Sequence, residues 1–205
     1  MPTAEKVDLY KLHKNEYVTP KKPVLLDVQP AKYLSISGTG APGSEEFQKK
    51  MGALYGTAFT LKFESKFAGC DYAVCKPEGI YWTDAGGPGF QSLPMDRWHW
   101  DLIIRTPDFV TAPRLKAAQA KMIDKGVPEA AEVVFQEIGE GKCVQLLHVG
   151  PYTEEKANVE SMCAFARSEG YEFAGKHHEI YLSDPRRVAP EKLKTILRIP
   201  VRRLK

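Results

Sequence analysis

The sequence predicts an α+β fold made of two pseudo-symmetric halves, each with a strand, a helix and two further strands. Three observations lead to this prediction. Apolar residues alternate with period two in some segments and recur every three or four residues in others, in the same order twice. Turns rich in glycine and proline separate these segments, and three short landmarks recur along the chain. Such thin halves bury their apolar faces only by pairing, so we expect a ligand cleft between them.

The first half is expected at about residues 24–125. Residues 1–23 are polar and end in Pro-Lys-Lys-Pro, so we interpret them as a lead-in segment outside the core, with the domain at 24–205. Residues 32–37 alternate as a strand does, and a glycine-rich turn follows, with Ser44 placed to cap a helix. Beyond Ser44, apolar residues at three- and four-residue steps predict one buried helix face.

Two strands and a second helix complete this half. The strands are expected within 71–84 and 97–107, and the helix at 112–125 ends before Gly126 and Pro128. The connecting loop at residues 84–94 is rich in glycine and proline, and we expect it to form a rim that influences specificity.

The second half is expected at about residues 131–205. The apolar segments 132–138 and 142–150 flank the turn Gly-Glu-Gly, a pattern that predicts a β-hairpin. A helix is expected to run up to Gly170, and two more strands within 176–185 and 194–203.

Three landmarks align the two halves as a degenerate repeat. The first is a turn before a helix, the second an Ile-Tyr pair in a strand, and the third a strand end that contains arginine and proline. The matched segments are 38–40 with 150–152, 80–81 with 180–181, and 104–107 with 197–200.

Composition narrows the class of protein. Twenty-nine Lys and Arg against 26 Asp and Glu give a net charge of +3, too small to attract nucleic acid by counterion release, so we expect no direct contact with nucleic acid. The basic residues near the C-terminus are expected to be solvated; they are Arg198, Arg202, Arg203 and Lys205. The four cysteines lack the spacing of zinc or redox motifs. The chain has no signal-peptide pattern and no run of 18 apolar residues, so we expect a soluble, cytoplasmic protein without membrane contact.

A candidate catalytic group lies in the segment HHEIYLSDP. Strand alternation places His177, Glu179 and Tyr181 on one face and His178 on the other. If that face lines the cleft, Glu179 could act as a general base or pair with a cation, and Tyr181 could donate a hydrogen bond. The alternative is a solvent-facing strand with ordinary pKa values. Neighbouring histidines on opposite faces cannot share one ion, so we expect no metal site.

The first half supplies aromatic side chains. Tyr55 lies on the expected helix, Tyr81 on one strand, and Trp98 and Trp100 on a common face of the next. Aromatic residues at this density usually form core, but rings facing a carboxylate also suit a flat hydrophobic ligand. The chain has no G-x-S-x-G elbow, Walker loop or dinucleotide fingerprint.

Two long segments resemble the GyrI-like small-molecule-binding family: LLHVGPYTEE and HHEIYLSDPRRVAPEKLKTILRIPV. In the first half, KYLSISGTG and RWHWDLIIRTP are also similar, so the resemblance covers about residues 24–203. It implies tandem SHS2-like modules with a lipophilic, often cationic or planar, ligand held between them.

The resemblance also implies roles for individual residues. The family's key acid corresponds to Glu179, and its neighbouring phenol to Tyr181. The form HHEIYLSDPRR is most similar to stand-alone members that hydrolyse cyclopropane-bearing DNA-alkylating compounds. Such an enzyme would seat its ligand on aromatic residues and His177, activate water through Glu179, and need no cofactor. The alternatives are a non-catalytic toxin-binding protein and a gyrase-modulating protein. The sequence specifies neither the natural ligand nor the oligomeric state.

Overall fold

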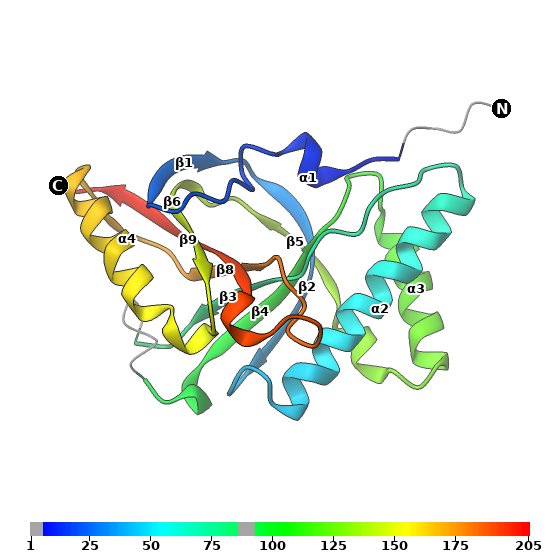
Figure 1. Cartoon of the computed structure of the whole chain (residues 1–205). Coiled ribbons are helices and arrows are strands. Elements are labelled where there is room, and N and C mark those ends of the chain that lie inside the picture. The colour runs from blue at the N-terminus through cyan, green and yellow to red at the C-terminus, as the bar shows by residue number, and fades with distance from the viewer. Residues whose placement is uncertain (1–5, 86–92) are drawn as a thin grey trace.

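The computed structural model describes residues 6–85 and 93–205, and in them one antiparallel sheet of nine strands carries the helices (Figure 1). The helices are α1 (Leu9–Leu12), α2 (Glu45–Phe67), α3 (Ala112–Asp124) and α4 (Lys156–Ser168). The strands are β1 (Val24–Val28), β2 (Ala31–Thr39), β3 (Glu78–Trp82), β4 (His99–Arg105), β5 (Val134–Ile138), β6 (Gly141–Val149), β7 (Tyr171–Phe173), β8 (His177–Tyr181) and β9 (Lys194–Arg203). The predicted α+β class is therefore confirmed.

The strand order is symmetric about its centre. It runs β1-β6-β9-β8-β3-β4-β2-β5, with β7 added on β9. Each half contributes its first strand to the outer edge of the other half, because β1 pairs with β6 and β5 pairs with β2. The two halves are thus joined as one continuous sheet with exchanged edge strands.

The expected hairpin around the turn Gly-Glu-Gly is wrong. β5 pairs with β2, and β6 pairs with β1 and β9, so the strands on either side of the turn diverge. The connection between β5 and β6 instead lies against the one between β1 and β2, where a Cβ on Gly139 would be 3.2 Å from Pro30 Cγ. A glycine turn alone does not decide whether its flanking strands pair, since other strands compete for the same edges.

A pseudo-twofold axis passes between β3 and β8. Gly79 pairs with Glu179, and on either side Glu78 pairs with Ile180 and Ile80 with His178. Exchanging each β3 residue with the β8 residue 100 positions later leaves this register unchanged. The sequence alignment of Tyr81 with Tyr181 therefore matches residues that the pseudo-twofold axis relates.

The turn landmark is displaced by two residues. The Gly40 N–H donates to Trp98 O, and the Gly150 N–H donates to Leu193 O. Gly40 therefore corresponds to Gly150 and not to residue 152, as the sequence alignment had placed it.

Helices α2, α3 and α4 pack on one face of the sheet, α2 and α3 over one half and α4 over the other (Figure 1). α2 begins at its predicted cap, where Ser44 Oγ accepts from Phe47 N–H. It covers a core that includes Leu102 and Trp100. α4 covers a second core that includes Leu197 and Ile199. None of the helices in the described ranges is long and apolar enough to cross a membrane.

The lead-in segment packs on the other face, so placing it outside the core is wrong. Tyr17 packs there against Ile180 and Ile196, and Glu16 Oε2 lies 2.6 Å from Arg105 Nη1. Leu9 is buried in the core beneath α2. Arg198 donates to the Glu16 carbonyl oxygen and to Gln145 Oε1. Arg198 is 1% exposed, which corrects the prediction that it is solvated.

This face also holds a buried ionic network around His178. Its Nδ1 lies 3.0 Å from Glu140 Oε1 and its Nε2 lies 2.9 Å from Glu78 Oε2. Glu140 pairs in addition with Arg198 at 3.1 Å. Because adjacent strand residues point to opposite faces, this network is separated from the face that carries Glu179.

Candidate functional site

One row of paired residues across the sheet places Glu179 between the part covered by α2 and the part covered by α4. Glu179 pairs with Gly79 on one side and Leu197 on the other, and Gly79 pairs with Leu102. Directly paired residues in a sheet point to the same face. Leu102 lies under α2 and Leu197 under α4, so Glu179 faces the gap between them. The predicted roles of Glu179 depend on this face lining a ligand site, and they stay predictions.

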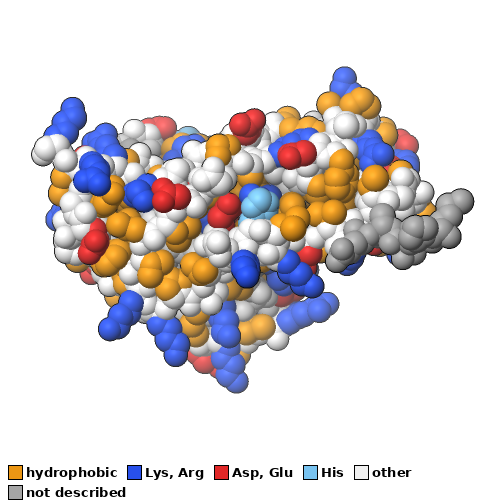
Figure 2. All heavy atoms as spheres, turned by 90° about the horizontal axis from the view of Figure 1, so that it is seen from above, with side chains coloured by type: hydrophobic (Ala, Val, Ile, Leu, Met, Phe, Trp, Pro, Cys, Tyr) orange, Lys and Arg blue, Asp and Glu red, His pale blue; other side chains and the backbone are white. Residues whose placement is uncertain are grey.

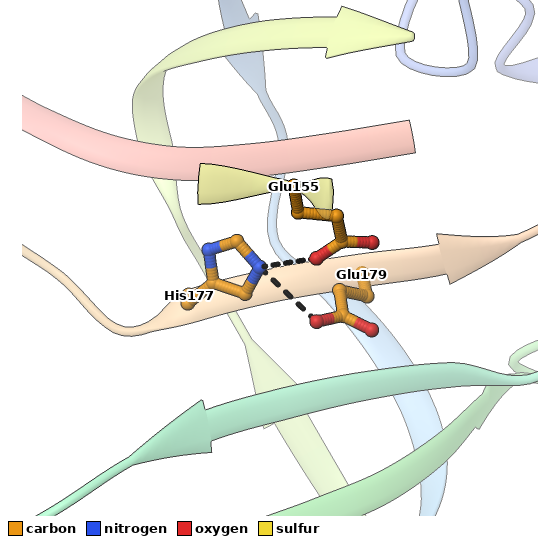
Figure 3. A group of neighbouring side chains, drawn as sticks. All are labelled: Glu155, His177 and Glu179. Carbon is orange, nitrogen blue, oxygen red and sulfur yellow. Dashed lines mark ion pairs between the residues drawn. The ribbon is translucent and has the colours of Figure 1, made fainter. Parts of the chain in front are cut away.

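Glu155, His177 and Glu179 form a compact buried cluster (Figure 3). His177 Nε2 lies 3.2 Å from Glu179 Oε1 and 3.8 Å from Glu155 Oε2. His177 and Glu179 are two residues apart on β8, whereas Glu155 immediately precedes α4. Glu155 is 2% and Glu179 8% exposed, so Glu179 is the carboxylate more open to a ligand.

The buried cluster shifts the pKa values of Glu155 and His177. Burial, and after it the nearby charge of Glu179, raise the pKa of Glu155 to about 8, although His177 opposes the shift. Burial lowers the pKa of His177, but its contacts with Glu155 and Glu179 outweigh this and raise it to about 9. Near pH 7, Glu155 therefore carries a proton and His177 is an imidazolium, which lies beside the carboxyl group of Glu179.

Two phenols converge next to Glu179. The Tyr81 and Tyr181 hydroxyls form a short hydrogen bond in which either oxygen can donate. Burial raises the pKa of both phenols well above the ordinary value, and the charge of Glu179 adds to the effect. Both hydroxyls therefore stay protonated near neutral pH and remain available as donors.

Three groups of the cluster could also hold a metal ion. One donor atom each from Glu155, His177 and Glu179 lies within 4.8 Å of the others. Around a tetrahedral zinc ion, bonds of about 2.0–2.2 Å place ligand atoms roughly 3.3 Å apart. The donor types and their spacing therefore fit such an ion. His178 is not among these donors, because it lies on the opposite face of the strand from His177, as the sequence indicates. The absence of a metal ion stays a prediction.

The predicted aromatic residues divide into two groups. Tyr81 is in the site, and Trp98 packs edge-on against it with ring centroids 6.1 Å apart. Tyr55 is half-buried on α2 and stacks on Phe59. Trp100 is fully buried, contacts Phe47 edge-on and donates from Nε1 to Gly40 O. Trp100 therefore belongs to the core beneath α2.

Sequence reasoning missed Glu155 and Tyr152. They lie just before α4, and the Tyr152 ring meets the Tyr181 ring edge-on with centroids 5.8 Å apart. His148 holds this turn, since Nδ1 lies 2.8 Å from Asn158 Nδ2 and Nε2 lies 3.0 Å from Pro151 O. The segment PYTEE was visible only as a turn, because nothing local indicates that it folds over β8.

One face of the molecule carries side chains of all types. On the face seen in Figure 2, basic, acidic and apolar side chains are interspersed. Two hollows of the described surface lie on α2, one beside its start and one beside Phe59 and Phe63. The predicted rim loop at 84–94 falls largely on residues 86–92, which lie outside the described residues.

Together, these observations define an α+β protein with a buried acid–imidazole–phenol cluster on the face of the sheet that carries α2 and α4. Residues 107–202 match the model of the GyrI-like small molecule binding domain. A search of the curated proteins found no match.

Solved structures extend this similarity to nearly the whole chain. An uncharacterized conserved protein from Listeria innocua is 38% identical, with 96% of this chain and 100% of that one covered and a TM-score of 0.88. A hydrolase from Listeria innocua is also 38% identical, with the same coverage and a TM-score of 0.85. The EcmrR C-terminal domain, at 12% identity, 89% and 98% coverage and a TM-score of 0.61, shares the fold. This chain belongs to the GyrI-like family.

Proposed function

We propose that this protein binds flat lipophilic small molecules and hydrolyses cyclopropane-bearing alkylating compounds with water activated by Glu179. The observation that carries the proposal is the pairing of the less buried carboxylate of the cluster with two protonated phenols. Glu179 is the more exposed acid of its cluster, and Tyr181 and Tyr81 lie beside it. The similarity to a protein named as a hydrolase supports a catalytic function.

The reaction is the net addition of one water molecule. Glu179 takes a proton from water as the water oxygen forms a bond to a ring carbon, and one carbon–carbon bond of the cyclopropane breaks. The electron pair of that bond moves into an electron-accepting group conjugated with the ring, and this group takes up a proton. Tyr181 assists by donating a hydrogen bond to the group on which negative charge develops.

His177 and Glu155 support this role of Glu179. The imidazolium of His177 lies 3.2 Å from Glu179 and orients its carboxylate. Glu155 keeps its proton near pH 7, so it adds no second negative charge to the site. Trp98 packs against Tyr81 and offers an aromatic surface for the ligand.

The test uses a cyclopropane-bearing alkylator and follows the ring-opened product by mass spectrometry, against a blank without protein. We expect turnover by the wild type and a loss of about 10²- to 10⁴-fold in Glu179→Gln, the usual contribution of a general base. Glu191→Gln, an exposed acid after β8, is the matched control and should retain activity. Both are assayed after dialysis against a chelator, because the proposal needs no metal ion.

Each other outcome contradicts a defined part of the proposal. Activity that the chelator abolishes would overturn the metal-free mechanism. Equal turnover in Glu179→Gln would remove Glu179 as the base. Binding without product would reject hydrolysis of that compound and favour the non-catalytic alternative, in which the carboxylate balances the charge of a cationic ligand.

A further inference from the structure

The site is asymmetric although the fold around it is symmetric. The pseudo-twofold axis passes through the pair formed by Gly79 and Glu179, so each occupies the other's symmetry-related position. Tyr81 and Tyr181 are also related by this axis, and both are retained as tyrosines. At the pair on the axis the symmetry therefore breaks, because one half has a carboxylate and the other has no side chain.

The space above Gly79 is filled by the two phenols. A Cβ on Gly79 would lie 2.7 Å from Tyr181 Oη and 2.8 Å from Tyr81 Oη, closer than real Cβ atoms approach their neighbours. It would also lie 2.7 Å from Tyr81 Cε2. Gly79 is a strand residue without a positive φ, so the backbone conformation does not require glycine here. The requirement comes from the close approach of the tyrosines.

We propose that Gly79 is a positioning residue that lets the Tyr81 and Tyr181 hydroxyls meet beside a single carboxylate. A side chain at position 79 would push the phenols apart, and an acid there would place a second carboxylate opposite Glu179. The consequence for packing follows from the geometry alone, whereas the consequence for turnover rests on the proposed hydrolase function. Because Gly79 has no side chain, the site contains one base, Glu179, and two hydrogen-bond donors, Tyr81 and Tyr181.

The test is a double-mutant cycle with Gly79→Ala, Tyr181→Phe and the two combined. We expect Gly79→Ala to lower the thermal midpoint by several degrees, on the order of 5 °C. Because Tyr181→Phe removes the oxygen 2.7 Å from the new Cβ, the midpoint should fall less when Gly79→Ala is introduced in that background. Gly52→Ala is the matched control, because Gly52 is exposed on α2 with nothing within 4 Å of its Cβ, and it should not lower the midpoint.

Activity separates positioning from stability. In protein that is folded at the assay temperature, Gly79→Ala should lower kcat by roughly 10-fold or more. The reason is that a hydrogen-bond donor placed at developing charge contributes at least this factor to kcat. The double variant should regain stability but not kcat, because the phenol that assists is gone.

Two results would overturn the inference: a wild-type midpoint and kcat in Gly79→Ala, or a loss of stability that is the same with and without the Tyr181 hydroxyl. If Gly79→Ala alone does not fold, folding of the double variant supports the inference and its failure to fold contradicts it. If the wild type shows no turnover, the stability cycle still tests the role of Gly79, so the two failures are distinguishable.

Discussion

At the scale of single residues, the site depends on two carboxylates that differ in their environments. Glu155 is almost completely buried, and its pKa is raised to about 8, whereas Glu179 is next to the phenols and partly accessible. Because Glu155 keeps its proton near pH 7, it adds no negative charge beside Glu179. The buried cluster therefore gives the two acids different roles.

Glu155→Gln tests this division, since glutamine mimics the protonated acid. Ionisation of Glu155 above pH 8 would place a second negative charge where charge develops on the ligand. We expect wild-type turnover to fall several-fold as pH rises through about 8, and Glu155→Gln to lose this fall while remaining active at pH 7. The pH profile of kcat/KM is the measurement, with the exposed Glu154→Gln as control. An unchanged fall in Glu155→Gln would contradict the assignment.

At the scale of elements, the lead-in segment is a structural part of the domain. Arg105 and Arg198 lie on the sheet beneath it, and Glu16 reaches the first with its carboxylate and the second with its carbonyl oxygen. Tyr17 accepts from Arg105 and contributes a second contact. A polar segment thus covers charged strands through ion pairs and hydrogen bonds and not only through apolar packing.

Glu16→Gln should destabilise the protein, because it leaves the buried guanidinium of Arg105 without its carboxylate. Breaking a buried ion pair from one side costs about 3–5 kcal/mol. We expect the free energy of unfolding, measured in urea, to fall by an amount of this order. The exposed pair of Glu172 with Arg202 offers the control, and Glu172→Gln should change stability by less than about 1 kcal/mol. If Glu16→Gln and Glu172→Gln lower the free energy of unfolding by equally small amounts, the stability of the protein does not depend on the pair of Glu16 with Arg105.

At the scale of the whole molecule, the network on the far face sets how stability depends on pH. Burial lowers the pKa of His178, but Glu140 and Glu78 outweigh it and raise it to about 9. Burial raises the pKa of Glu140, but His178 and Arg198 outweigh it and lower it to about 2. The fold is therefore weakened at alkaline pH, where His178 loses its proton, and at acidic pH, where Glu140 gains one.

The signs define a window of maximal stability. The contribution of His178 is complete below its unfolded pKa of 6.5 and is lost as pH rises through 9, and His177 behaves in the same way. The contribution of Glu140 is present above 4.5 and is lost as pH falls through 2. Glu155, whose pKa is raised from 4.5 to about 8, has the opposite sign and disfavours the folded state increasingly as pH rises above 4.5. We therefore expect the urea midpoint to be highest near pH 4.5 and to fall on either side. In Glu140→Gln, the urea midpoint should fall less at acidic pH than it does in the wild type. An unchanged fall would contradict the contribution assigned to Glu140.

Much of the fold could be predicted because helices and strands are specified by local periodicity. The Ser44 cap, the helix faces and the alternation that joins His177, Glu179 and Tyr181 all depend on neighbouring residues. The hairpin prediction failed because strand pairing depends on which distant edges compete. The lead-in prediction failed because polar composition does not exclude burial when every charge has a partner.

The sequence by itself determined that Glu179 and Tyr181 share a strand face and that Tyr81 is repeated in the other half, because strand alternation and a repeat are properties of the chain. Only the tertiary structure decided that Glu155 completes the cluster and that Gly79 leaves room for both phenols. Glu155 is 24 residues from Glu179 and Gly79 is 100 residues away. Contacts across such separations arise from strand pairing and from the packing of α4 on the sheet, which no local pattern encodes.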